Sequence, residues 1–170
     1  MTNESERLPY NFAPASLRIR LAAMIYDALL LIGIAMLVTY AMLSLLQWSY
    51  PLSPTRRLGL QVVLFITVGT YLTICWIRSG QTLGMKAWRI KVIDAEARPP
   101  RMARAIARYV LAWHLWVPGL ALAALFHYST SSSLVTLAVG FGLLLMPALF
   151  DRQRRLLHDR WTGTRVARVP

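Results

Sequence analysis

The chain has 170 residues, of which 56% are hydrophobic and 15% are charged, and its mean hydropathy is +0.47. This length allows one small helical bundle and excludes a second soluble domain of ordinary size. The net charge is +12, and a single cysteine excludes an intramolecular disulfide and a metal site built from several thiolates.

Residues 1–15 are expected to form a polar arm and residues 16–168 a single membrane domain. The apolar run after the arm is too long for a signal peptide, so we expect it to remain as a membrane anchor. Four runs have the length and composition of membrane spans. They cover about 21–46, 58–77, 109–126 and 134–150. The sequence therefore predicts an all-α membrane protein, a bundle of four transmembrane helices.

The basic residues are distributed unevenly along the chain. Residues 1–20, the loop 78–108 and the tail 151–170 hold 17 of the 19 basic residues, and the other side of the predicted bundle holds Arg56 and Arg57. Basic residues accumulate on the cytoplasmic side of membrane proteins. We therefore predict a multi-pass protein of the bacterial inner membrane, with both termini and the long loop in the cytoplasm.

The loop and the tail contain further patterned segments. The segments KAWRIKVID and GTRVARV alternate in polarity and are predicted to pair as a small ribbon against the membrane. An amphipathic helix is predicted to lead into the third span. Anionic lipid headgroups are favoured over nucleic acid as partners, because the positive charge lies beside membrane spans. The arginines expected to meet headgroups are Arg101, Arg104, Arg108, Arg152, Arg154 and Arg155.

Asp27 is the one acidic residue inside a long apolar run, where a charge costs about 3 kcal/mol on insertion scales. Arg20 precedes it by two helical turns, and its side chain should point away from Asp27 toward the headgroups. The partner of Asp27 is therefore expected on the second or third span. Thr73 and His114 are candidates there, because they should lie at a similar depth. Asp27 then either couples ion movement or forms a structural hydrogen bond between helices. For His114, an aromatic cluster with the neighbouring tryptophans is the alternative.

The pair His158 and Asp159 suggests a metal-dependent hydrolase, but such enzymes need further ligands, and the chain has three histidines. We expect no enzyme, metal or cofactor. Asp159 is instead predicted to order the tail, paired with an arginine such as Arg89 or Arg20. Two glycines in SGQTLGMK lack the spacing of a phosphate-binding loop and are interpreted as turn and close-packing residues.

Three motifs occur in order: ASLRIRLAAMIYD, GQTLGMKAWRIKVID and LLHDRWTGTRV. Together they resemble the RDD family of small bacterial membrane proteins, which is named for one arginine and two aspartates. Arg20 and Asp27 match the first two positions, and Asp159 matches the third, with Asp94 as the alternative. Ala97 stands where a glycine commonly follows the strand-like segment.

The resemblance implies transport of an ion or small solute, including cation/proton exchange for some members. The position of Asp27 within an apolar run makes it the candidate coupling carboxylate. The alternative is a non-catalytic membrane adaptor or assembly factor, whose basic cytoplasmic face binds a partner protein or anionic lipid. A homo-oligomer or a membrane-protein partner would suit either function, and no nucleic-acid partner is expected.

Overall fold

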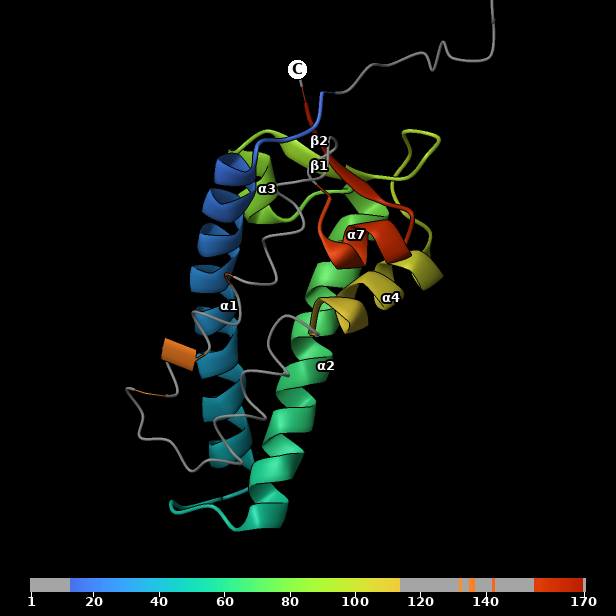
Figure 1. Cartoon of the computed structure of the whole chain (residues 1–170). Helices are drawn as coiled ribbons and strands as arrows, with labels where there is room; N and C mark the ends of the chain where they lie inside the picture. Colours follow the sequence, from blue (N-terminus) through green and yellow to red (C-terminus); the bar gives the residue numbers. More distant parts are fainter. Residues whose placement is uncertain (1–12, 114–131, 133–134, 137–141, 143–154, 170) are drawn as a thin grey trace, which may run out of the picture.

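The computed structural model describes residues 13–113, 132, 135–136, 142 and 155–169. Its two longest helices are α1 (Leu17–Leu45) and α2 (Pro54–Ser79). The two helices run in opposite directions and are joined at one end by a short connection (Figure 1). The other described elements gather mainly at the opposite end of this helix pair.

Capping residues determine where both long helices begin and where α2 ends. The side chains of Ser16 and Ser53 each accept a hydrogen bond from the backbone N–H three residues later. Pro54 occupies the first turn of α2, where a missing N–H costs no helical hydrogen bond. Gly80 follows α2 with a φ of 72°, the left-handed conformation that commonly ends helices. Both helices therefore extend beyond the cores of the predicted spans.

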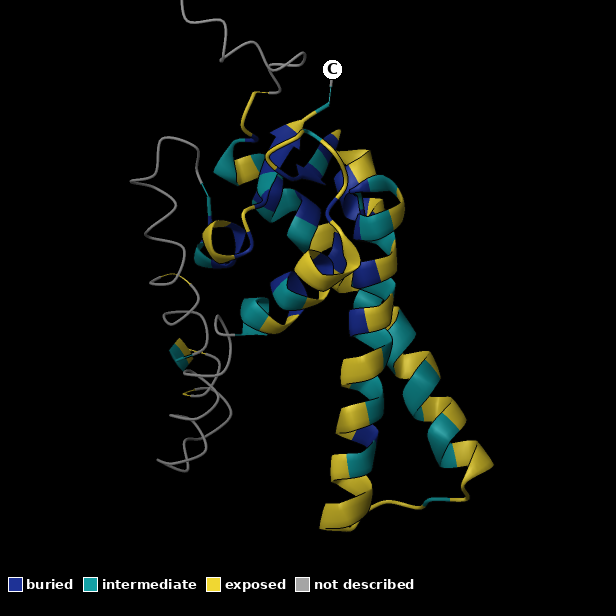
Figure 2. Ribbon diagram, turned by 90° about the vertical axis from the view of Figure 1, so that its right-hand side faces the viewer, coloured by how far each residue is buried: buried dark blue, intermediate teal, exposed yellow. Residues whose placement is uncertain are grey.

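The surface of both long helices is suited to lipid. Each is long and apolar enough to cross a membrane. In the most apolar 18-residue window, 11% of the α1 residues and 22% of the α2 residues are buried inside the protein. Exposed residues line much of their length (Figure 2), including the large apolar side chains of Leu29, Met36 and Ile66. A core helix of a soluble protein would be hydrophobic and also buried.

A small folded unit, here called the platform, occupies the end of the helix pair opposite the connection. It consists of α3 (Leu83–Ala87), β1 (Ile90–Ile93), α4 (Met102–Ala112), α7 (Leu157–Trp161) and β2 (Arg165–Arg168). The two strands pair antiparallel, with Ile90 opposite Arg168 and Ile93 opposite Arg165. The predicted pairing of these two segments is therefore confirmed.

The residues before α1 join the same ribbon. The backbone N–H of Ala15 donates to the carbonyl oxygen of Val166 at 3.0 Å, and that of Arg168 donates to Ala13 at 2.9 Å. The start of α1 is therefore fixed to the C-terminal strand, although the two are separated by almost the whole chain.

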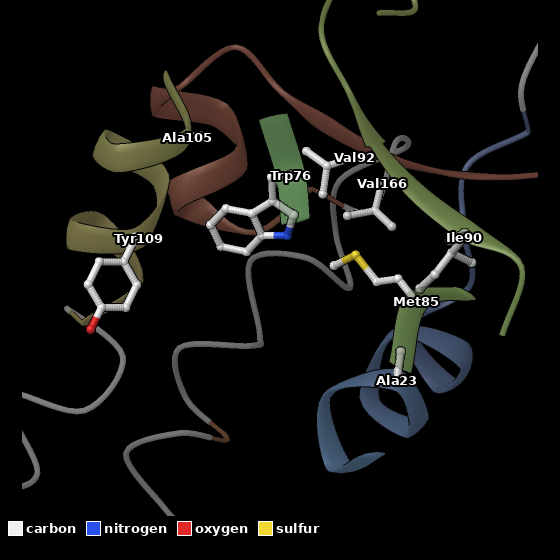
Figure 3. Close-up of a cluster of buried hydrophobic side chains, with 9 residues drawn as sticks. Ala23, Trp76, Met85, Ile90, Val92, Ala105, Tyr109 and Val166 are labelled. Atoms are coloured by element: carbon white, nitrogen blue, oxygen red, sulfur yellow. The ribbon is translucent and has the colours of Figure 1, made fainter. Parts of the chain in front are cut away.

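A hydrophobic core lies beneath the ribbon. Val92 and Val166 face each other across the two strands, and Met85 of α3 and Trp76 of α2 point toward them (Figure 3). Ala23 of α1 completes this side of the cluster. The short strands gain their stability from this burial, because an isolated two-stranded ribbon is marginal in water.

Asp94 shapes the turn after β1. Its Oδ1 accepts hydrogen bonds from the backbone N–H groups of Glu96 and Arg98, each at 3.0 Å. Ala97, in the middle of the turn, has a φ of 61°, a conformation that strains most residues and leaves glycine unstrained. The glycine that the family resemblance implies at this position would therefore fit the turn.

The third and fourth predicted spans lie mostly outside the described residues. α4 ends at Ala112, just after the predicted start of the third span at 109. The bundle of four transmembrane helices therefore stays a prediction, whereas α1 and α2 contain the first two predicted spans.

Candidate functional site

The Asp27 carboxylate joins α1 to the short helix α3. Its Oδ2 accepts a hydrogen bond from the hydroxyl of Thr82, and its Oδ1 accepts one from the backbone N–H of Gly84 at 2.8 Å. Thr82 is the N-cap of α3, and its oxygen also accepts the N–H of Met85 at 3.2 Å. Asp27 is buried, with 8% of its surface exposed. Both carboxylate oxygens are therefore satisfied by the first turn of α3.

Gly84 makes this junction sterically feasible. A Cβ at position 84 would lie 2.9 Å from the Asp27 carboxyl carbon and still closer to the carbonyl oxygen of Ala23. Only a glycine lets the α3 backbone approach α1 closely enough to donate to the carboxylate. Gly80 has a related role, because a Cβ there would lie 2.6 Å from the Val92 carbonyl oxygen. The interpretation of both glycines as turn and close-packing residues is confirmed.

The expected partners of Asp27 need correction. They were expected on the second or third span, but the hydrogen bonds of the carboxylate go to α3, in the loop after α2. Thr73 is buried in α2 and is not one of these two hydrogen-bond donors. His114 lies outside the described residues.

A second buried cluster surrounds Asp159 in α7. Arg20 of α1 donates to its Oδ2, and Arg108 of α4 donates to its Oδ1. The backbone N–H of Leu156 also donates to Oδ2 at 3.0 Å, and His158 Nε2 lies 3.4 Å from Oδ1. The Asp159 side chain has no exposed surface. A single carboxylate thus ties α1, α4 and α7 together, and the prediction that Asp159 pairs with Arg20 is confirmed.

Arg108 is further held by neutral partners. Its guanidinium donates to the Thr164 hydroxyl at 2.8 Å and lies over the Trp76 ring, with its central carbon 5.1 Å from the ring centroid. The cation–π contact brings α2 into the same cluster. The expectation that Arg108 meets lipid headgroups is wrong, because its side chain is buried and directed toward Asp159. Arg20 is likewise buried and bound to Asp159, rather than directed toward headgroups as predicted.

The charges in this cluster determine its ionisation. Burial alone would raise the pKa of Asp159, but the positive charges of Arg108 and Arg20 outweigh burial and hold that pKa well below its usual value. Burial lowers the pKa of Arg108, and the neighbouring Asp159 opposes this. Arginine stays protonated at any physiological pH. Asp159 is therefore a permanent anion between two cations, which suits a structural role better than proton exchange.

The remaining residues singled out in the sequence are Asp94 and the arginines expected to meet headgroups. Asp94 orders the turn after β1, and its Oδ2 is 3.8 Å from Arg104. It does not join the Asp159 cluster. Arg101 and Arg104 are exposed, as headgroup contacts require. Arg155 is half-buried, and Arg152 and Arg154 lie outside the described residues.

An open groove of about 490 Å³ lies along α2 beside the end of α4. It is lined by Gln61, Val62, Leu64, Phe65, Val68 and Trp113. This lining is nearly all apolar and includes neither Asp27 nor Asp159, so the groove is separate from both buried carboxylates. Within the part of the chain that the structure describes, no group of His, Cys, Asp or Glu residues could hold a metal ion.

Three contributors to these clusters were not identified as such from the sequence. Thr82 precedes a five-residue helix that is too short to give a periodic signal, although a threonine before such a segment is a typical N-cap. The backbone N–H of Gly84 has no sequence signal at all. Trp76 was counted only as part of an apolar span, because a tryptophan there is ordinarily a lipid or packing contact.

The described fold is mostly helical, with two long apolar helices and, at one end, the platform with its buried charges. These are features of a membrane protein that has a polar domain at one end of its spans. Residues 14–163 match the family model described as the RDD family. The chain therefore belongs to the RDD family, which is a family of membrane proteins. Searches of curated proteins and of solved structures found no match.

Proposed function

We propose that this protein is a non-enzymatic membrane adaptor, which holds the platform at the cytoplasmic face of the bacterial inner membrane and recruits a partner protein there. The proposal rests on how the protein engages its two buried carboxylates. Asp27 and Asp159 each have both oxygens engaged by groups of the protein itself. Carboxylates engaged in this way support a fixed architecture, because each oxygen already binds a group of the protein itself.

The exposed charge of the platform supports recruitment. Its basic surface, including the two adjacent helix ends, consists of Arg18, Arg78, Lys86, Arg89, Arg98, Arg101, Arg104, Arg160 and Arg168. Among the described residues at this end, Glu96 is the one exposed acidic side chain. A surface of one sign steers an oppositely charged partner and raises the rate of encounter. The partner is therefore expected to present an acidic face.

The ribbon end is the best candidate for the contact itself. Lys86 and Arg89 flank Trp88, whose side chain is 45% exposed, and Arg168 lies opposite Ile90 in the ribbon. Arginine and tryptophan are enriched at the energetically important centres of protein interfaces. The same end faces away from the long apolar helices (Figure 1), so the bilayer would leave it accessible.

Crosslinking in native membranes tests this proposal. A photoreactive group at Trp88 should capture a reproducible partner, and capture should be lost in the variant Lys86→Glu/Arg89→Glu/Arg168→Glu. The matched control is Arg56→Glu/Arg57→Glu, which reverses exposed charges at the opposite end of α2 and should leave capture unchanged. Recovery of the same proteins from both variants, or of none from the wild type, would contradict recruitment by the ribbon.

Transport of an ion or small solute is the second candidate, favoured by the position of Asp27 within the long apolar helix α1. In this function Asp27 is the coupling carboxylate and must exchange α3 for a cation or proton during the cycle. Purified protein in liposomes should then carry out cation- or proton-dependent flux, which Asp27→Asn should abolish while the fold remains intact. Absence of flux in the wild type would remove this candidate.

A further inference from the structure

The outward face of α4 is an apolar stripe. Met102, Ile106 and Val110 are spaced four residues apart and are 64%, 42% and 52% exposed. Four-residue spacing places them along one side of a helix. A different side of the helix carries Ala105, Arg108 and Tyr109, which are all buried. We call Met102, Ile106 and Val110 the α4 stripe.

Contacts with the rest of the protein fix the rotation of α4 about its own axis, so the α4 stripe cannot turn toward the protein interior. The Tyr109 hydroxyl donates to the carbonyl oxygen of Phe65 at 2.7 Å, and the Tyr109 ring occupies the space where a Cβ on Gly69 would lie, at 2.5 Å. Arg108 is held by Asp159 and by the Trp76 ring. Rotating α4 to bury the stripe would break all of these contacts.

The direction of α4 also differs from that of a span. Its axis crosses α2 rather than following it, in both views of the molecule (Figures 1 and 2). The arginines at its start, Arg98, Arg101 and Arg104, are exposed. A short crosswise helix with an apolar stripe and with arginines at its start has the composition of helices that lie in the membrane interface.

We propose that α4 is a lipid-binding helix at the headgroup boundary of an anionic leaflet. The α4 stripe contacts the upper part of the acyl chains, and Arg101 and Arg104 contact lipid phosphates. Charge complementarity identifies the occupant, because the residues at the start of α4 are basic and the cytoplasmic leaflet is anionic. The inference uses the membrane location of the family and requires no partner protein, so recruitment by the ribbon can fail without affecting it.

Fluorescence quenching in vesicles tests the proposal on the full chain. Ile106→Cys, in a Cys75→Ser background, is labelled with an environment-sensitive dye and placed in phosphatidylcholine vesicles containing phosphatidylglycerol. Some of these lipids carry a nitroxide near the top of the acyl chain. The label should emit at shorter wavelength and be quenched at least about twofold more than the same label at Ala95→Cys, an exposed turn residue.

Three outcomes would overturn the proposal. Equal quenching at the two positions would mean that the stripe is in water. Short-wavelength emission at Ile106 without extra quenching would mean that protein covers the stripe. Quenching at Ile106 that is unchanged by Arg101→Glu/Arg104→Glu, in vesicles rich in phosphatidylglycerol, would mean that these two arginines do not contact lipid phosphates. Circular dichroism of each labelled variant checks that the helices are retained.

Discussion

Replacing Asp159 with asparagine should lower the free energy of unfolding of the platform by about 3–5 kcal/mol, the largest effect expected from a single substitution here. The variant leaves Arg20 and Arg108 buried without their shared anion. Thermal unfolding in detergent, followed by tryptophan fluorescence, measures the loss, because Trp76 lies against Arg108. Glu96→Gln is the matched control: it neutralises an exposed carboxylate and should change stability by less than about 0.5 kcal/mol.

A double-mutant cycle checks the origin of this loss. If the contact with Arg108 carries it, the double variant Arg108→Met/Asp159→Asn should lose at least about 1 kcal/mol less than the sum of its single variants. Additive losses would contradict a direct coupling.

The loss of stability in Asp159→Asn should also depend on pH, because the pKa of Asp159 is lower in the folded protein than in an unfolded chain. The ionised Asp159 stabilises the folded protein above about pH 4, and this stabilisation is lost as the pH falls further. The free energy of unfolding of Asp159→Asn should therefore fall less steeply with decreasing pH than that of the wild type.

Gly84→Ala should also be strongly destabilising, by about 2–4 kcal/mol. The new methyl group would collide with the Ala23 carbonyl oxygen and the Asp27 carboxyl group, so α3 must move away and its N–H must leave Asp27. This steric effect outweighs the better helix propensity of alanine, which is worth about 1 kcal/mol. Thermal unfolding in detergent measures the difference.

Gly33→Ala is a close control for that substitution. Gly33 lies within α1, and a Cβ there would meet nothing within 4 Å among the described atoms. The same chemical change should therefore leave stability unchanged or raise it by up to about 1 kcal/mol. Equal effects of the two substitutions would show that the close approach of α3 to α1 is unimportant.

The elements with strong periodicity or composition signals could be predicted from the sequence. The apolar runs gave the first two spans, and alternation of polarity gave both strands of the ribbon, although 71 residues separate Ile93 from Arg165. Asp27 stood out because charged residues are rare within apolar segments, and Arg20 and Asp159 stood out through the family motifs. Hydrophobic pattern and charge are local properties, so a sequence shows them directly.

The contacts among these residues could be predicted only in part. Spacing along α1 showed that Arg20 and Asp27 are not a simple pair, but it could not show that α3 folds back onto α1, because that depends on a backbone approach at Gly84. Arg108 was misassigned because three regularly spaced arginines look alike in a sequence. Which side of α4 faces the protein depends on tertiary contacts, namely the packing of Tyr109 on Gly69 and the pairing of Arg108 with Asp159.

The Asp27 carboxylate is a structural tie between α1 and α3. Hydrogen–deuterium exchange of residues 83–87 in Asp27→Ala tests it most directly, because the Gly84 N–H donates to the carboxylate. We expect these amides to exchange at least about tenfold faster than in the wild type, which corresponds to about 1.4 kcal/mol. The turn 94–98, which Asp94 holds independently, should be unchanged. Wild-type exchange rates at residues 83–87 would contradict the claim.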